Sequence, residues 1–155
     1  MPRKFLVVVD DSPEFEAALR FASRRARSTG GRVVMLRVLP SNSDVHWSGA
    51  REEIERQQRQ EAEALLNRLG EEAQARSGAA PMFLIEQGEA QAAIKKVVGA
   101  DPDIKILVLA AGTGSRGLGP LVSAIIKQGA QIGGRKLPVT IVPGELTEDE
   151  IEDLA

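Results

Sequence analysis

The 155-residue sequence predicts an α/β protein with a doubly wound, five-stranded parallel sheet and helices on both faces. Two observations support this fold class. Five short apolar runs alternate with amphipathic helical segments, and short connections join them. The first run, residues 5–9 (FLVVV), is apolar without interruption, which is typical of a strand buried on both faces.

A helix is expected directly after this first strand and should end at Gly30. Asp11 or Ser12 can cap it, and Glu14 is placed for a capping box with Asp11. If one of these two residues serves as the cap, Asp10 is left free to face a ligand.

The spacing of apolar residues, every second position or continuous in strands and every third or fourth in helices, predicts the remaining elements. Further strands are predicted over residues 32–39, 82–85, 104–110 and 137–142, and further helices over residues 51–75, 89–98 and 121–128. A glycine-rich loop, residues 112–119, leads to Pro120 in the first turn of the last of these helices.

The expected strand order is 3-2-1-4-5, with the first strand in the centre. In such sheets, ligands bind beyond the carboxyl ends of the strands, where the strand order reverses. The reversal falls between the first and fourth strands. We therefore expect the loops at residues 10–12 and 111–119 to meet and form a site.

The segment GTGSRG, residues 112–117, matches G-x-G-x-x-G after a strand. Glycines let the backbone approach a phosphate, and the following helix start offers free N–H groups. A dinucleotide site would follow the first strand and carry an acid about 20 residues later. This loop follows the fourth strand, and residues 129–136 contain no acid. It indicates a nucleotide or phosphate cradle, or a flexible glycine turn, rather than NAD binding.

Other function classes find little support. There is no cysteine, and His46, the only histidine, makes neither a metal site nor a triad by itself, even beside Trp47. A phosphoacceptor receiver domain would need an Asp at the end of the third strand, where Glu86, Gln87 and Gly88 stand. No catalytic motif occurs, so we expect no enzyme, or at most a slow ATPase.

The charge is unevenly distributed. Residues 145–155 hold six acidic groups and no basic one, which leaves 20 basic and 16 acidic groups, a formal +4, for residues 1–144. That small excess argues against nucleic-acid binding, and no apolar run is long enough for a membrane span. A cytoplasmic protein is expected, with a domain at residues 1–144 and an acidic tail at residues 145–155.

The acidic tail has two interpretations. It is either a solvated end that aids solubility or a short helix that docks through Ile151 and Leu154. Thr147 and Glu150 match a capping box, which would begin such a helix.

Several short motifs together resemble the universal stress protein family. They are VDDS at residues 9–12, LRV at residues 36–38, the glycine-rich loop, and PVTIVP at residues 138–143. The likeness covers residues 4–144. It implies a five-stranded doubly wound fold, homodimers and, in some members, ATP binding.

The resemblance also implies site residues. In ATP-binding members the adenosine lies against the ends of the first two strands, and the phosphates lie on a G-x2-G-x9-G-[ST] loop. This sequence departs from that loop, because Ala110 and Thr113 stand at the first two glycine positions and Ser123-Ala124 at the final pair. By motif match, the expected nucleotide-binding residues are Val9, Asp10, Ser12, Val38, Ala110, Gly112, Thr113, Gly114, Gly119, Ser123 and Ala124.

Two main function classes therefore stay open. One is a stress-response or regulatory protein that binds an adenine nucleotide such as ATP, and the other is a dimeric interaction module of the same fold without a nucleotide. A flavin- or nucleotide-dependent enzyme of a related fold is a third, and the lack of acid–base groups counts against it. Homodimerisation is expected through the edge strand from Val139 to Val142, whose unpaired backbone groups a second copy would satisfy.

Overall fold

The computed structural model describes residues 3–42, 47–112, 119–128 and 131–155. Its main sheet has five parallel strands in the order β3-β2-β1-β4-β7, which confirms the predicted order because β7 is the fifth strand of this sheet. The strands are β1 (Lys4–Val9), β2 (Arg32–Leu39), β3 (Met82–Gln87), β4 (Ile104–Ala111) and β7 (Val139–Pro143).

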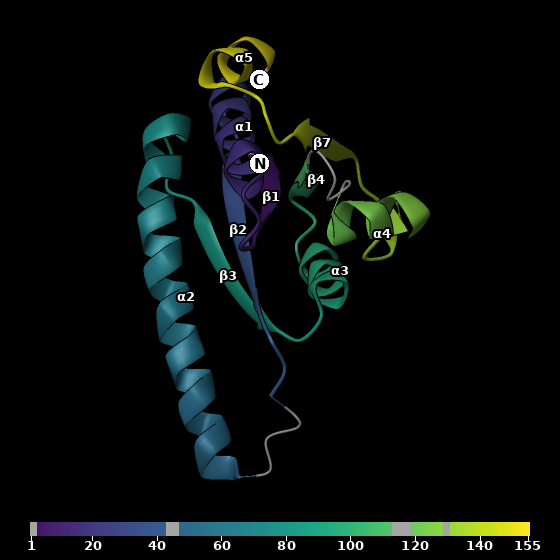
Figure 1. Ribbon diagram of the computed structural model, residues 1–155. Coiled ribbons are helices and arrows are strands. Elements are labelled where there is room, and N and C mark those ends of the chain that lie inside the picture. The colour runs from purple at the N-terminus through teal and green to yellow at the C-terminus, as the bar shows by residue number, and fades with distance from the viewer. Residues whose placement is uncertain (1–2, 43–46, 113–118, 129–130) are drawn as a thin grey trace.

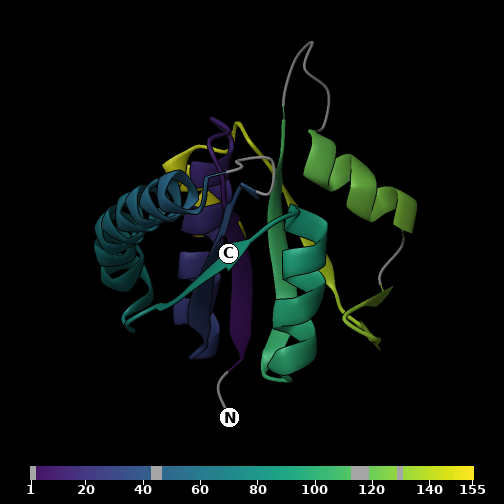
Figure 2. The same ribbon diagram turned by 90° about the horizontal axis from the view of Figure 1, so that it is seen from below.

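Helices cover both faces of the sheet, as Figures 1 and 2 show. On one face lie α1 (Phe15–Thr29) and α2 (Ser48–Ser77). On the other lie α3 (Ala90–Ala100) and α4 (Pro120–Gln128). The doubly wound architecture is therefore the predicted one.

Side chains of β1 enter both apolar cores. Phe5, Val7 and Val9 pack in the core beneath α1 and α2. Leu6 and Val8 pack in the core beneath α3 and α4. Because both faces of this central strand are buried, all of these positions are apolar, which explains the uninterrupted run in the sequence.

The start of α1 differs from the prediction. Helix α1 begins at Phe15, and its N-cap, Glu14, makes no side-chain capping bond. The Asp10 Oδ1 atom instead accepts the Ser12 N–H at 2.9 Å and the Ser12 hydroxyl at 2.6 Å. The predicted cap by Asp11 or Ser12, and the capping box of Asp11 and Glu14, are wrong. An aspartate readily bonds the backbone two residues on, and this turn delays the helix.

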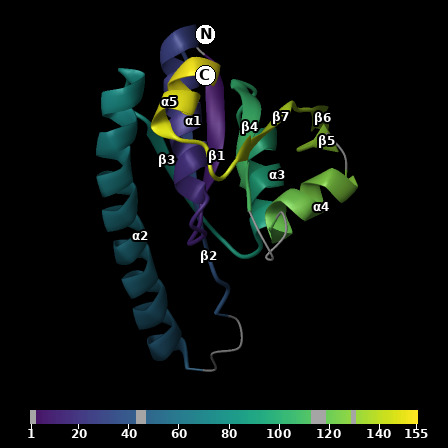
Figure 3. The ribbon, with the colours of Figure 1, turned by 45° about the horizontal axis from the view of Figure 1, so that its top comes forward.

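Helix α2 is longer than predicted, and its N-terminal half projects past the carboxyl ends of the strands (Figures 1 and 3). No side chain described between residues 47 and 61 is buried. Polar side-chain contacts of the described residues link this half to the ends of β2 and β3. Gln58 accepts a hydrogen bond from Asn42 at 3.0 Å, and Glu55 accepts one from Gln87 at 3.3 Å.

A small hairpin precedes β7 and was not predicted. It consists of β5 (Gln131–Ile132) and β6 (Arg135–Lys136), joined by two glycines with φ of +64° and +81°. The Arg135 guanidinium donates to the carbonyls of Val98 at 3.0 Å and Asp101 at 2.9 Å. The hairpin is thereby tied to the end of α3.

The acidic tail forms a helix, α5 (Glu148–Leu154), which lies against α1 (Figure 3). The predicted capping box is confirmed, with Thr147 and Glu150 bonding each other's backbone N–H at 3.0 and 3.2 Å. Ile151 is 2% exposed, whereas Leu154 is 59% exposed. The docked interpretation of the tail is therefore confirmed for Ile151, whereas Leu154 does not pack into the body of this chain.

None of the helices in the described parts of the chain combines the length and apolar character needed to cross a bilayer.

Candidate ligand-binding site

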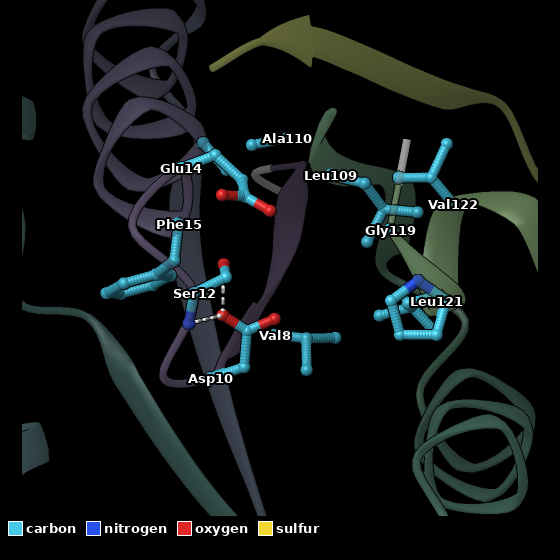
Figure 4. Close-up of a pocket in the computed structure, with 12 residues that line it drawn as sticks. Val8, Asp10, Ser12, Glu14, Phe15, Leu109, Ala110, Gly119, Leu121 and Val122 are labelled. Carbon is cyan, nitrogen blue, oxygen red and sulfur yellow. Dashed lines mark hydrogen bonds between the residues drawn. The ribbon is translucent and has the colours of Figure 1, made fainter. Parts of the chain in front are cut away.

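A cavity of about 70 Å³ lies where β1 and β4 end, at the predicted reversal of strand order. The ends of these two strands and the starts of α1 and α4 surround it (Figure 4). Asp10 and Ser12 from the first of the two expected loops and Gly119 from the end of the second line the cavity together, and residues 113–118 of the second loop lie outside the described residues. The lining residues are Val8, Asp10, Ser12, Glu14, Phe15, Ala18, Leu109, Ala110, Gly119, Pro120, Leu121 and Val122.

One wall of the cavity is polar and acidic. The oxygens of Asp10, Ser12 and Glu14 lie along this wall, beside the start of α1 (Figure 4). Asp10 is not free, contrary to the sequence interpretation, because its Oδ1 atom accepts both bonds from Ser12. These bonds hold the Asp10 carboxylate at the cavity, where its oxygens can accept hydrogen bonds from a ligand.

The opposite wall is apolar. Val8 and Leu109 come from the strand ends, and Leu121 and Val122 come from the first turn of α4 (Figure 4). Among the described lining residues there is no lysine or arginine. This combination suits an uncharged ligand group that has hydroxyl or N–H donors on one side.

The start of α4 borders the same cavity. Gly119 has φ of +96° and accepts the Ser123 N–H at 3.1 Å, and Pro120 opens the helix as predicted. The Glu14 Oε1 atom lies 4.0 Å from the position that a Cβ on Gly119 would take. The carboxylate of the residue that precedes α1 therefore lies near the residue that precedes α4.

Four of the residues expected from the sequence line the cavity together: Asp10, Ser12, Ala110 and Gly119. Thr113 and Gly114 lie outside the described residues, as does His46.

The other expected residues lie elsewhere. Val9 is buried in the core beneath α1 and α2, and Val38 packs against the core on the opposite face. Gly112, Ser123 and Ala124 are half-buried and do not line this cavity.

Sequence reasoning missed several lining residues. Glu14 was assigned to a capping box, and Val8 and Leu109 were assigned only to the core. A signal for Glu14 was present, because it lies within the loop that leaves β1 at the reversal of strand order. The sequence interpretation assigned Glu14 to a helix cap and therefore did not consider it as a lining residue.

Arg37 was also missed, although its neighbour Val38 was predicted. The Arg37 Nη1 atom donates to the Val9 carbonyl at 3.0 Å, and Nη2 lies 3.4 Å from the Asp11 carboxylate. Arg37 thus ties β2 to the loop that carries the polar wall. Beside this loop, a second groove of about 230 Å³ runs towards Arg68 of α2.

The chain that leaves β7 packs behind the acidic wall. The Gly144 N–H donates to the Ala111 carbonyl at 3.2 Å. A Cβ placed on Gly144 would lie 2.5 Å from the Cβ of Glu14, which is closer than real Cβ contacts allow. Only glycine leaves room here, so Gly144 packs directly against the backbone and Cβ of Glu14.

In the described residues, no three histidine, aspartate or glutamate side chains are grouped to hold a metal ion.

The fold and the cavity together define a doubly wound α/β protein with a cavity at the reversal of its strand order. The family model described as the universal stress protein family matches residues 1–128. The chain belongs to the universal stress protein family. No curated protein matches the chain significantly.

Solved structures share this fold. The universal stress protein UspA from Lactobacillus plantarum matches with a TM-score of 0.72 and 18% identity, over 90% of this chain and 97% of that one. A universal stress protein in complex with cAMP has a TM-score of 0.65 and 14% identity, over 93% and 98%. A universal stress protein family protein from Arabidopsis thaliana with AMP bound has a TM-score of 0.60 and 21% identity, over 92% of each chain.

Proposed function

We propose that this universal stress protein binds an adenine nucleotide between β1 and β4 and acts as a nucleotide-dependent regulator in a stress response. The observation that carries this proposal is the acceptor pair of Asp10 and Ser12, held by their own hydrogen bonds at a preformed cavity. ATP is the first ligand to test, with AMP and adenosine beside it. The related structures with cAMP and AMP support the choice of an adenine ligand.

The cavity is large enough for only part of a nucleotide. Sites that enclose a drug-sized ligand measure about 300–1,000 Å³, whereas this cavity measures about 70 Å³. A ribose edge suits it, because sugar hydroxyls can donate to Asp10 while the carbon atoms contact Val8 and Leu109. The base and the phosphates would then extend beyond it.

A second candidate function is a nucleotide-free interaction module of the same fold. It is favoured by the absence of cationic side chains among the described lining residues and by Ala110, whose methyl group stands at a glycine position of the ATP-binding pattern. Neither candidate function includes a catalytic role.

Both candidates include a cytoplasmic homodimer that forms through β7. This strand ends the described sheet, next to β4, so its outer backbone groups can pair with a second copy. Ile141 of this strand is 39% exposed and would be covered in such a pair.

Native mass spectrometry of gently purified protein tests the proposal directly, by detecting adenine nucleotide that co-purifies. Calorimetry should then show adenosine binding that Asp10→Asn weakens about tenfold, because a charged acceptor is lost while the bonds to Ser12 are kept. Asp11→Asn is the matched control, since Asp11 is 89% exposed and does not line the cavity. No co-purified nucleotide and no binding at millimolar adenosine would favour the interaction module.

A further inference from the structure

The β3 edge of the sheet is open in the described part of the chain. Strand β3 pairs with β2 alone, in six consecutive register pairs without a bulge. Every second residue of an edge strand directs its N–H and C=O groups away from the sheet. At β3 no strand among the described residues meets these groups.

This edge also lacks the features with which edge strands usually prevent further pairing. Lysine, proline and bulges commonly serve that purpose. The residues of β3, MFLIEQ, include neither lysine nor proline. The charged residue of the strand, Glu86, pairs with Lys96 of α3 at 3.0 Å. The strand is therefore a template on which a further strand can form.

A groove of about 400 Å³ lies between β3 and α2, which runs beside this strand (Figures 1 and 3). Its apolar lining consists of Phe83 and Ile85 of β3 and Leu66 of α2. The polar side chains that line it all come from α2: Arg59, Glu63 and Asn67. The open edge thus has an apolar groove with a polar rim directly beside it.

Phe83 is held in this groove although it is 40% exposed. Its ring lies directly on α2, because a Cβ added to Gly70 would collide with the ring atom Cζ. Glycine destabilises a helix interior relative to alanine, and at position 70 the missing side chain makes room for the ring. The ring therefore offers a fixed apolar surface rather than a freely moving side chain.

We propose that the β3 edge is a docking site for an extended segment of another protein, which adds to the sheet as a further strand. The open N–H and C=O groups select an extended main chain. The groove selects apolar side chains at every second position of that segment, because alternate side chains of a strand point to the same face. The site is separate from the proposed nucleotide site and does not depend on it.

A second copy of this chain suits the edge less well than a lone strand. The proposed homodimer uses β7, which leaves β3 at the far end of each sheet. Two copies paired through β3 about a two-fold axis would also bring their α2 helices together. No side chain described between residues 47 and 61 is buried, and this half of α2 is mainly polar, so it offers little apolar surface for such a contact.

Fluorescence anisotropy with labelled peptides of about eight residues tests the proposal on the full chain. The peptides alternate valine, leucine or phenylalanine with lysine and glutamate, so that one face of the extended peptide is apolar. At least one should bind the wild type with a Kd below about 0.1 mM. The same peptide with methylated backbone nitrogens keeps its side chains but loses its N–H donors, and it should bind at least about tenfold more weakly.

Variants of the protein locate the binding. Phe83→Lys places a charge in the groove and should weaken peptide binding at least about tenfold. Phe83→Thr, which keeps a strand-forming residue, should weaken it about threefold. Ile141→Lys on β7 is the matched control and should stay within about twofold, because Ile141 lies at the opposite edge of the sheet.

Four outcomes would overturn the inference. They are that no peptide binds at about 1 mM, that the methylated peptide binds as well as its parent, that Ile141→Lys and Phe83→Lys weaken binding alike, or that Phe83→Lys turns a dimer into a monomer. The last result would mean that a second copy occupies the edge. Adenosine binding should be equal in all three variants, so a failed peptide test leaves the proposed function standing.

Discussion

The Arg76 Nη2 atom donates to the Glu148 Oε1 atom at 2.6 Å, which joins the end of α2 to the first turn of α5. Arg24 of α1 adds a second link, with its Nε atom 2.9 Å from Glu152. Together with buried Ile151, these contacts attach the acidic tail to the basic surface of α1 and α2. Gly144, the residue directly before the tail, packs against Glu14 at the candidate site.

Acid should loosen the tail. The hydrogen bond from Arg76 and its positive charge hold the pKa of Glu148 below its ordinary value of 4.5, and the charge of Arg20 adds to this. Because the folded pKa is the lower one, the contact stabilises the fold above about pH 4.5 and is lost as the pH falls through the folded value. The protection factors of residues 145–155 in hydrogen exchange, which are corrected for the intrinsic pH dependence of exchange, should fall there. Glu148→Gln should show lower protection already at pH 7 and a protection that depends less on pH.

Ile151→Ala should destabilise the protein by about 1–3 kcal/mol, because Ile151 is the buried side chain of the tail. The cost has an upper limit, because α5 can detach once its contact with the body is weakened. Leu154→Ala is the matched control and should stay within about 0.5 kcal/mol, because Leu154 is largely exposed. Urea unfolding measures both. Equal effects of the two substitutions would contradict the packing of α5 described above.

The proposed dimer can be tested at both edges of the sheet. Ile141→Lys on β7 should yield a particle of 16.6 kDa in light scattering, whereas the wild type should show twice that mass. Phe83→Lys on β3 is the matched control, because Phe83 is 40% exposed at the opposite edge. It should remain dimeric. A monomeric wild type, or a dimer broken only by Phe83→Lys, would refute pairing through β7.

Asp101 should matter for folding stability. Its carboxylate lies 2.7 Å from the Lys4 ammonium, and this pair joins β1 to the turn before β4. Burial raises the pKa of Asp101, but the hydrogen bonds from Lys4 and the Asp103 N–H, with the charges of Lys4 and Arg135, bring it below 3.8. Its contribution is therefore present above pH 3.8 and lost as the pH falls through the folded value.

Asp101→Asn should cost about 1–2 kcal/mol at pH 7 and progressively less at two pH values chosen below 3.8. Asp103→Asn, two residues along in the same turn, should cost less, because Lys4 pairs with Asp101. Urea unfolding at these pH values measures the difference. A cost for Asp101→Asn that does not change with pH would contradict the ion pair.

The sequence by itself determined the sheet and the place of the cavity. The run at residues 5–9 is apolar at every position because β1 is buried on both faces, and this local pattern alone indicates a central strand. With β1 in the centre, the predicted strand order places the reversal point between β1 and β4. The capping box at Thr147 and Glu150 was likewise predictable, because its partners are three residues apart.

Only the tertiary structure decided which side chains face the cavity and what holds the tail. The turn at Asp10 and Ser12 competes with a helix cap, and Gly144, from the far end of the chain, packs against Glu14. Arg76 and Glu148 are 72 residues apart in the chain. Periodicity reports which face of an element is apolar, but it carries no information about contacts between distant elements, which depend on how the packed layers bring them together.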